Sequence, residues 1–115
     1  MYIFQLNIHL PGDVQVDDVS TVLGLHAIDP ISEDGSLWMV EDEQPESGWI
    51  DFIGRYCESI RSGLSELQNL GIGANDISIC MLYEYDQQCD MEFNPDELKA
   101  MGELGITFCI SCWEK

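Results

Sequence analysis

Residues 2–10, YIFQLNIHL, alternate between apolar and polar side chains. The apolar set comprises Phe4, Leu6, Ile8 and Leu10, and the polar set comprises Gln5, Asn7 and His9. Successive side chains of a β-strand point to opposite faces, so this pattern predicts a strand with one buried face. The Pro-Gly-Asp sequence that follows at 11–13 predicts a turn.

Three other segments show helical patterns. Residues 16–23 place their apolar side chains on one face of a helix. Residues 50–67 repeat apolar side chains at spacings of three and four, which predicts one long helix, with Ser47 as a cap at its start. The letters FNPDEL, residues 93–98, contain an N-cap asparagine followed by proline, which predicts the start of a third helix.

The remaining apolar segments have the pattern of strands. Residues 37–41 read as the second half of a hairpin whose first half lies within 25–31. Residues 76–85 predict a strand that pairs with 87–93 across a tight connection, and 106–113 alternate as a closing strand.

The resulting order is βαββαββαβ, without repeats or linkers. It predicts an α+β fold in two layers, with one mostly antiparallel or mixed sheet and helices packed on one face. A length of 115 residues is typical of one domain, so residues 1–115 are expected to form a single acidic domain.

The charge balance limits the classes of partner. Asp and Glu number 22 against 4 Lys and Arg, which gives a formal net charge of −18 at pH 7. The acids are spread along the chain and do not form a tail. A negative field repels phosphates, so direct binding to nucleic acid or to anionic membranes is not expected. A cationic protein is the natural partner; the alternative is that the acidity serves solubility alone.

The cysteines and the apolar runs bear on the cellular setting. The five cysteines are Cys57, Cys80, Cys89, Cys109 and Cys112. Their scattered positions in apolar patterns predict reduced core thiols. No apolar run approaches the roughly 20 residues of a membrane helix, and the first residues lack the basic start of a secretory signal. A cytoplasmic protein is therefore expected.

The motifs that could carry chemistry are incomplete. The C-x-x-C at 109–112 lies in a predicted strand, where residues i and i+3 point to opposite faces and cannot share one centre. Asp34-Gly35 with Glu41 matches the end of a calcium loop, but Pro30 and Ser32 occupy two positions that need carboxylates. The sequence predicts a protein that is not an enzyme, with no catalytic residue, metal site or cofactor.

Residues 36–49, SLWMVEDEQPESGW, set carboxylates between two tryptophans. Aromatic side chains supply many of the anchors of protein interfaces, and acids attract a basic partner. The expected partner-binding residues are Glu41, Asp42, Glu43, Glu46, Trp49 and Tyr85. Trp38 is expected in the core, and the alternative for Trp49 is packing at the start of the next helix.

The segment CDMEFNPDELKAMGELGITFCISCW, residues 89–113, resembles the bacterial family called domain of unknown function 4279. Residues 14–25, VQVDDVSTVLGL, and 35–40, GSLWMV, extend the resemblance over nearly the whole chain. It implies a small α+β domain, often associated with toxin and immunity loci such as those of contact-dependent growth inhibition, without an agreed active site.

Charge, missing motifs and resemblance lead to one main hypothesis. The protein is expected to be an immunity or antitoxin-like protein that neutralises a basic toxin, such as a nuclease domain, by covering its active site with acidic side chains. The alternative is a small-molecule or metal-responsive sensor, with a ligand pocket between sheet and helices where cysteines and methionines cluster. The oligomeric state does not follow from the sequence.

Overall fold

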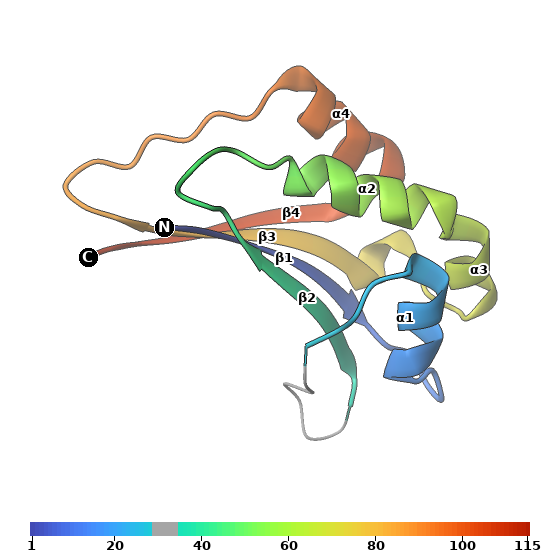
Figure 1. Ribbon diagram of the computed structural model, residues 1–115. Coiled ribbons are helices and arrows are strands. Elements are labelled where there is room, and N and C mark those ends of the chain that lie inside the picture. The colour runs from blue at the N-terminus through green and yellow to red at the C-terminus, as the bar shows by residue number, and fades with distance from the viewer. Residues whose placement is uncertain (29–34) are drawn as a thin grey trace.

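The computed structural model describes residues 1–28 and 35–115. The elements are β1 (Tyr2–His9), α1 (Val16–Leu23), β2 (Leu37–Glu43), α2 (Phe52–Ser62), α3 (Leu64–Asn69), the 3-10 helix η1 (Ala74–Asp76), β3 (Ile77–Tyr85), α4 (Pro95–Leu104) and β4 (Thr107–Glu114). The strands form a four-stranded sheet in the order β2-β1-β3-β4. The α-helices lie on one face of this sheet (Figure 1). The predicted two-layer α+β fold is confirmed.

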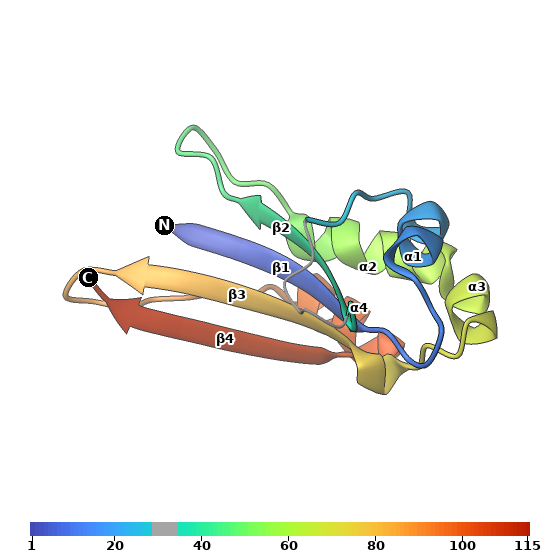
Figure 2. The same cartoon turned by 90° about the horizontal axis from the view of Figure 1, so that it is seen from below.

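β1 is an inner strand with an antiparallel partner on each side. It pairs with β2 and with β3, whereas β3 and β4 run parallel. Parallel neighbours need a crossover connection, and the segment containing α4 supplies it. Figure 2 shows β4 along the outer edge of the sheet.

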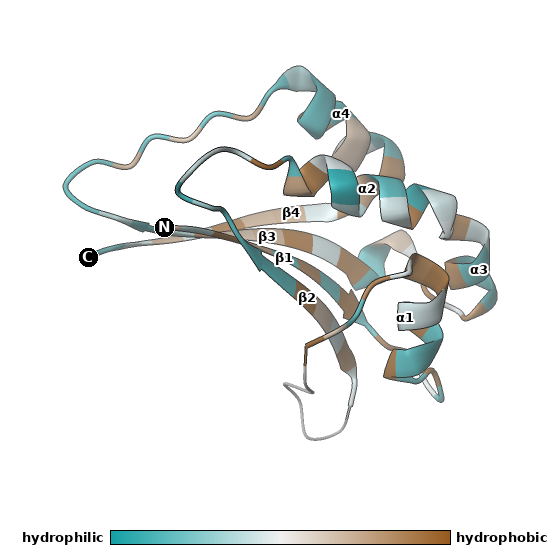
Figure 3. Cartoon of the chain, viewed as in Figure 1, coloured by the Kyte–Doolittle hydropathy of each residue, from teal (hydrophilic) through white to brown (hydrophobic). Residues whose placement is uncertain are grey.

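The pairing register of β1 brings the core side chains of three strands together. Leu6 lies opposite Val40 of β2 and Ile79 of β3, and Ile8 lies opposite Trp38 and Ile77. These side chains are buried, including Trp38 as predicted. The Trp38 indole N–H donates a hydrogen bond of 3.0 Å to the Ser20 hydroxyl of α1, so this buried polar group has a partner. Figure 3 shows hydrophobic residues along β1 and β3 beneath the helices, while the end of β2 is hydrophilic.

Two strand predictions fail in the described residues. The segment 87–93 is not a strand, because β1 and β4 already occupy both edges of β3. Its alternation has another cause, since Cys89, Met91 and Phe93 are half-buried while the acids between them are exposed.

The predicted hairpin before β2 is also wrong in its described part. Residues 29–31 lie outside the described residues, and 25–28 are not a strand. β2 pairs with β1 instead. A backbone hydrogen bond of 2.9 Å, from the Ile28 N–H to the Met39 carbonyl, joins the described part of the preceding segment to β2.

The helix predicted over 50–67 is divided at Gly63 into α2 and α3. Ser47 is not its cap. The Asp51 side chain accepts a 2.9 Å hydrogen bond from the Gly54 N–H and caps α2. Gly63 is buried against α1, and a Cβ at this position would lie 2.7 Å from Cγ1 of Val22. The absent side chain therefore allows α1 to approach the junction of α2 and α3 closely.

The cysteines do not form one class of core thiol. Cys57 is buried and free, as predicted. Cys80 and Cys109 are register partners on β3 and β4 and form a disulfide with a Cα–Cα distance of 4.6 Å, while Cys89 and Cys112 are free and not buried. The prediction of reduced core thiols is thus wrong for four of the five. The predicted separation of Cys109 and Cys112 is confirmed, because Cys112 aligns with Tyr83 on the opposite face.

Across 1–28 and 35–115, no helix has the length and apolar character needed to cross a membrane. The longest, α2, has 11 residues, about half of what a bilayer requires.

The Gly63→Ala variant tests the close approach of α1. The added methyl group overlaps the β-branched Val22, so we expect a loss of about 1–3 kcal/mol in the free energy of unfolding, measured by urea denaturation. Gly102→Ala in α4 is the matched control, because nothing lies within 4 Å of a Cβ there. The control should be neutral or more stable by about 0.5–1 kcal/mol. Equal effects of the two substitutions would contradict the packing described.

Candidate protein-binding surface

The four strands bring acidic side chains together at one end of the sheet. The end of β2, the start of β1 and the ends of β3 and β4 meet there, because β1 is antiparallel to β2 and β3, and β4 is parallel to β3. Both ends of the chain lie at this end (Figures 1 and 2). We call it the acidic end, defined by Glu41, Asp42, Glu43, Glu46, Glu84, Asp86, Asp90 and Glu114.

The predicted carboxylates are divided between the two faces of β2. Glu41 and Glu43 are exposed on the face away from the helices, and Glu41 accepts a 2.8 Å hydrogen bond from the Gln5 amide. Glu46 is exposed in the following loop. Asp42 points the other way and accepts a 2.6 Å hydrogen bond from the Tyr56 hydroxyl of α2. The structure therefore leaves three of the four predicted acids available to a partner and gives Asp42 a positioning role.

Four aromatic rings follow one another along the helix-facing side of the acidic end. Trp49 packs edge-on against Tyr2 with ring centroids 5.2 Å apart, Tyr2 stacks on Tyr83 at 4.2 Å, and Tyr83 lies 6.3 Å from Tyr85. We call Trp49, Tyr2, Tyr83 and Tyr85 the aromatic row. Trp49 keeps 59% of its surface exposed, so it is placed as an anchor that a partner could bury.

The loop that carries Trp49 is held by one side chain. The Gln44 amide donates a 2.6 Å hydrogen bond to the Ile50 carbonyl and accepts a 2.9 Å hydrogen bond from the Ile50 N–H. The Gln44 N–H also donates to the Tyr2 carbonyl at 2.9 Å. These bonds hold the loop 44–50 against the start of β1. Trp49 is therefore positioned beside Tyr2 in the unbound protein.

Sequence analysis identified the two outer members of the aromatic row, Trp49 and Tyr85, but missed Tyr2 and Tyr83 between them. Each inner ring sits in a recognised strand, so the missing information was the pairing of Tyr2 with Tyr83 across β1 and β3. The signal available in the sequence was a tyrosine at the start of one strand and near the end of another.

The hydroxyls of Tyr2, Tyr56 and Tyr85 stay protonated at neutral pH. A hydrogen bond with the Tyr83 side chain, together with burial, raises the pKa of Tyr2 to about 12. Burial and the carboxylate of Asp42 raise the pKa of Tyr56 even further. Partial burial and the nearby Glu114 carboxylate raise the pKa of Tyr85. The hydroxyls therefore remain neutral and can donate hydrogen bonds.

The free thiols are poorly suited to nucleophilic chemistry. Burial raises the pKa of Cys57 to about 11. Burial, and then the adjacent Cys112 thiol, raises the pKa of Cys89. Because the thiolate is the reactive form, these shifts disfavour a nucleophilic role for either cysteine at neutral pH. Among the described residues, no group of three or more His, Cys, Asp or Glu side chains is arranged to hold a metal ion.

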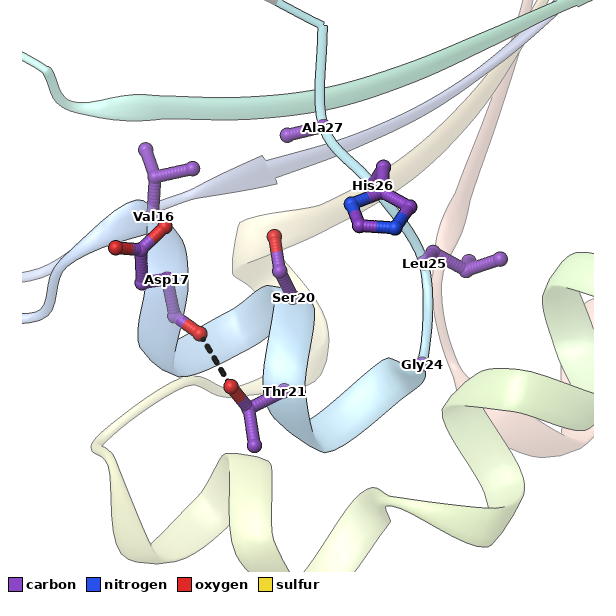
Figure 4. A pocket seen from close by; sticks show the side chains of 8 residues that line it. All are labelled: Val16, Asp17, Ser20, Thr21, Gly24, Leu25, His26 and Ala27. Atoms are coloured by element: carbon purple, nitrogen blue, oxygen red, sulfur yellow. Dashed lines mark hydrogen bonds between the residues drawn. The ribbon is translucent and has the colours of Figure 1, made fainter.

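A separate hollow of about 610 Å³ lies beside α1 and the segment that follows it. Figure 4 shows Asp17, Ser20, Thr21 and His26 around it, with the Thr21 hydroxyl donating to the Asp17 carbonyl at 2.9 Å. Its lining contains neither cysteine nor methionine. It therefore differs from the ligand pocket expected for a sensor.

No protein-family model, no curated protein and no solved structure matches this chain. The resemblance to the family called domain of unknown function 4279 stays a prediction, and the candidate surface depends on the geometry alone.

The Tyr56→Phe variant tests the contact between α2 and the acidic end. The hydroxyl donates to Asp42 at 2.6 Å, and its oxygen lies 3.2 Å from the Phe4 carbonyl. Its loss should cost about 1–2 kcal/mol of unfolding free energy at pH 7, because one acceptor is charged. A raised folded-state pKa gives stability that is complete below the ordinary value of 10.0 and declines as the pH rises above it. The difference between wild type and variant should therefore shrink in alkaline solution.

Urea denaturation at several pH values measures this difference. Tyr85→Phe is the control, because no hydrogen bond of the Tyr85 hydroxyl is seen within the described chain. A Tyr56→Phe variant as stable as this control at pH 7 would show that the Tyr56–Asp42 contact contributes nothing.

Proposed function

We propose that this protein captures a basic protein partner with its acidic end, and that it neutralises a cationic toxin domain, such as a nuclease, by covering the active site. The observation that carries the proposal is an exposed tryptophan in an ordered aromatic row among carboxylates. Together these features supply both long-range attraction and a local anchor.

The charge of the protein favours fast encounter with a basic partner. A formal net charge of −18 creates a field that steers cations toward the protein. At physiological salt the screening length is about 8 Å, so this steering acts only near the surface. Clustered carboxylates therefore contribute more to this steering than the total charge does. The convergence of strand ends at the acidic end provides such a cluster.

Affinity requires groups that lose water on binding. Trp49 is the best candidate, because its ring is exposed and its position is fixed by Tyr2 and the loop 44–50. Truncation of a buried tryptophan anchor typically costs about 2 kcal/mol or more, roughly a 30-fold loss of affinity. Exposed Glu46, in the same loop as Trp49, and Glu41 and Glu43, on the other face of β2, would occupy positions that substrate phosphates take in a nuclease.

The sensor alternative receives less support. The hollow beside α1 is lined mainly by one helix and the segment after it, and polar groups form much of its wall. Ligand pockets are usually deeper and predominantly apolar. The protein-binding proposal is the one that the geometry supports best.

A matched pair of charge-removal variants tests the proposal. The first is Glu41→Gln/Glu43→Gln/Glu46→Gln at the acidic end. The second is Asp13→Asn/Asp17→Asn/Glu66→Gln on exposed positions around α1 and α3, at the other end of the molecule. Both remove three negative charges. We expect the first variant, and Trp49→Ala, to lose a basic protein that wild type captures from a bacterial lysate at about 0.15 M salt, and the second variant to retain it.

The captured protein should be toxic when expressed alone, and co-expression of wild type should restore growth. Equal losses by the two charge variants would mean that binding follows total charge and would contradict a dedicated surface.

A further inference from the structure

The outer edge of β4 lacks the features that prevent edge strands from pairing. Residues 107–113, TFCISCW, contain no Asp, Glu, Lys, Arg or Pro. β4 has β3 on one side and no strand on the other among the described residues. The Cys80–Cys109 disulfide attaches it to the sheet. Natural edge strands are usually protected by charge, proline, a bulge or a covering segment.

The opposite edge of the sheet shows what such protection looks like. β2 carries three consecutive acids at 41–43. In addition, the Ile28 N–H donates to the Met39 carbonyl on its outer side. Charge and a covering segment therefore protect the outer edge of β2 from pairing with another strand. The outer edge of β4 has neither kind of protection.

Apolar side chains are exposed on both faces of β4. Ile110, on the helix-facing side, keeps 45% of its surface exposed, and Trp113, on the other face, keeps 41%. A helix laid on one face would cover only one of them. A strand added beside β4 brings neighbouring side chains to both faces, because side chains alternate along a strand.

The distribution of charge indicates which molecule can pair with the outer edge of β4. A basic segment would find no acid between Thr107 and Trp113, whereas a second copy of the chain presents the same uncharged strand. One of the four basic residues, Lys115, also directly follows β4. For two molecules that each carry −18, the edge of β4 is therefore a favourable place of approach.

We propose that β4 pairs antiparallel with β4 of a second copy across a two-fold axis, so that the two sheets become continuous. A two-fold interface uses the same surface on both subunits, which a strand paired with itself satisfies. The backbone groups on the outer edge of β4 then gain strand partners, which the described part of the monomer does not supply.

The uncharged segment fixes the register of this pairing. Its midpoint is Ile110, so Ile110 faces its own copy and Thr107 faces Trp113. A shift in one direction would bring Glu114 into the ladder, and a shift in the other direction would shorten the paired uncharged segment. In this register Lys115 lies beside Gly105 of the second copy, close to Glu103 near the end of α4. Opposite charges therefore meet at both ends of the paired segment.

The antiparallel arrangement places the two acidic ends far apart, at opposite ends of the joined sheet. Each remains open to a basic partner. The dimer therefore stands independently of the proposed function, and its failure would leave that proposal untouched.

Sedimentation velocity of the full chain over a range of concentrations tests the dimer. Raising the salt from about 0.1 M to about 1 M shortens the screening length from about 10 Å to about 3 Å and weakens the repulsion between the copies. We expect a concentration-dependent dimer that strengthens with salt. A protein that stays monomeric at both salt concentrations overturns the proposal.

Two lysine variants locate the interface. Ile110→Lys places two like charges face to face at the two-fold axis, so dimerisation should weaken by at least about tenfold. Ile28→Lys is the matched control, because Ile28 is 39% exposed, lies at the opposite edge of the sheet and undergoes the same change of charge. It should dimerise as wild type does. Circular dichroism checks that both variants fold, and equal dimerisation of the two overturns the proposal.

A cross-link tests the register without depending on the lysine variants. Ile110→Cys in a Cys89→Ser/Cys112→Ser background should give a disulfide-linked dimer on oxidation with diamide. Directly opposite residues of antiparallel strands have Cα atoms about 4.5–5.5 Å apart, within disulfide range. Ile28→Cys in the same background should remain monomeric. Peptide mapping should find the 110–110 link, and its absence overturns the proposed register.

Discussion

β1 makes backbone ladders with β2 on one side and β3 on the other, and the rest of the structure depends on the register of these two ladders. The buried side chains of Phe4, Leu6 and Ile8 define that register, because a shift of one residue would move all of them to the exposed face. The helices can cover the sheet only while these side chains point toward them. The core and the direction of every neighbouring strand are thus set by one inner strand.

The same two ladders create the candidate binding surface. They bring the start of β1 beside the three acids at the end of β2 and beside the tyrosines of β3. Tyr2 joins Trp49 to Tyr83 because β1 lies between β3 and β2, and β2 leads into the loop that carries Trp49. Asp42, which the sequence predicts as a partner-binding residue, connects the edge strand to α2 through Tyr56. Residues that stabilise the fold therefore lie at the same end of the sheet as the proposed binding surface, and the exposed acids are the ones that the proposal assigns to a partner.

The sequence predicted local features well, because local patterns determine them. The strands predicted from the patterns of 2–10 and 106–113 and the asparagine cap of α4 appear in the structure, although burial does not alternate along β4 beyond Phe108. Strand pairing is different, since partners distant in sequence leave no local sign. Residues 87–93 have the alternation of a strand, but the edge of β3 that they would need is taken by β4.

The same division between local patterns and strand pairing applies to the candidate site. Trp49 and the acids of β2 were recognised from composition, whereas the faces on which Glu41 and Asp42 lie, and the two inner tyrosines, depended on pairing. The Cys80–Cys109 bond was missed for the same reason, because only the parallel register of β3 and β4 makes these residues neighbours. Gly63 separates α2 from α3 although the apolar pattern continues through it, and only the structure shows that α1 packs closely there.

The central claim is that negative charge is organised at the acidic end and is not spread evenly over the surface. Titration of ¹⁵N-labelled protein with a short lysine-rich peptide, followed by amide and indole chemical shifts, tests it most directly. The account predicts that the largest changes fall on Trp49, the aromatic row and the ends of β2 and β3. Changes of similar size around the acids of α1, α2 and α3 would contradict it.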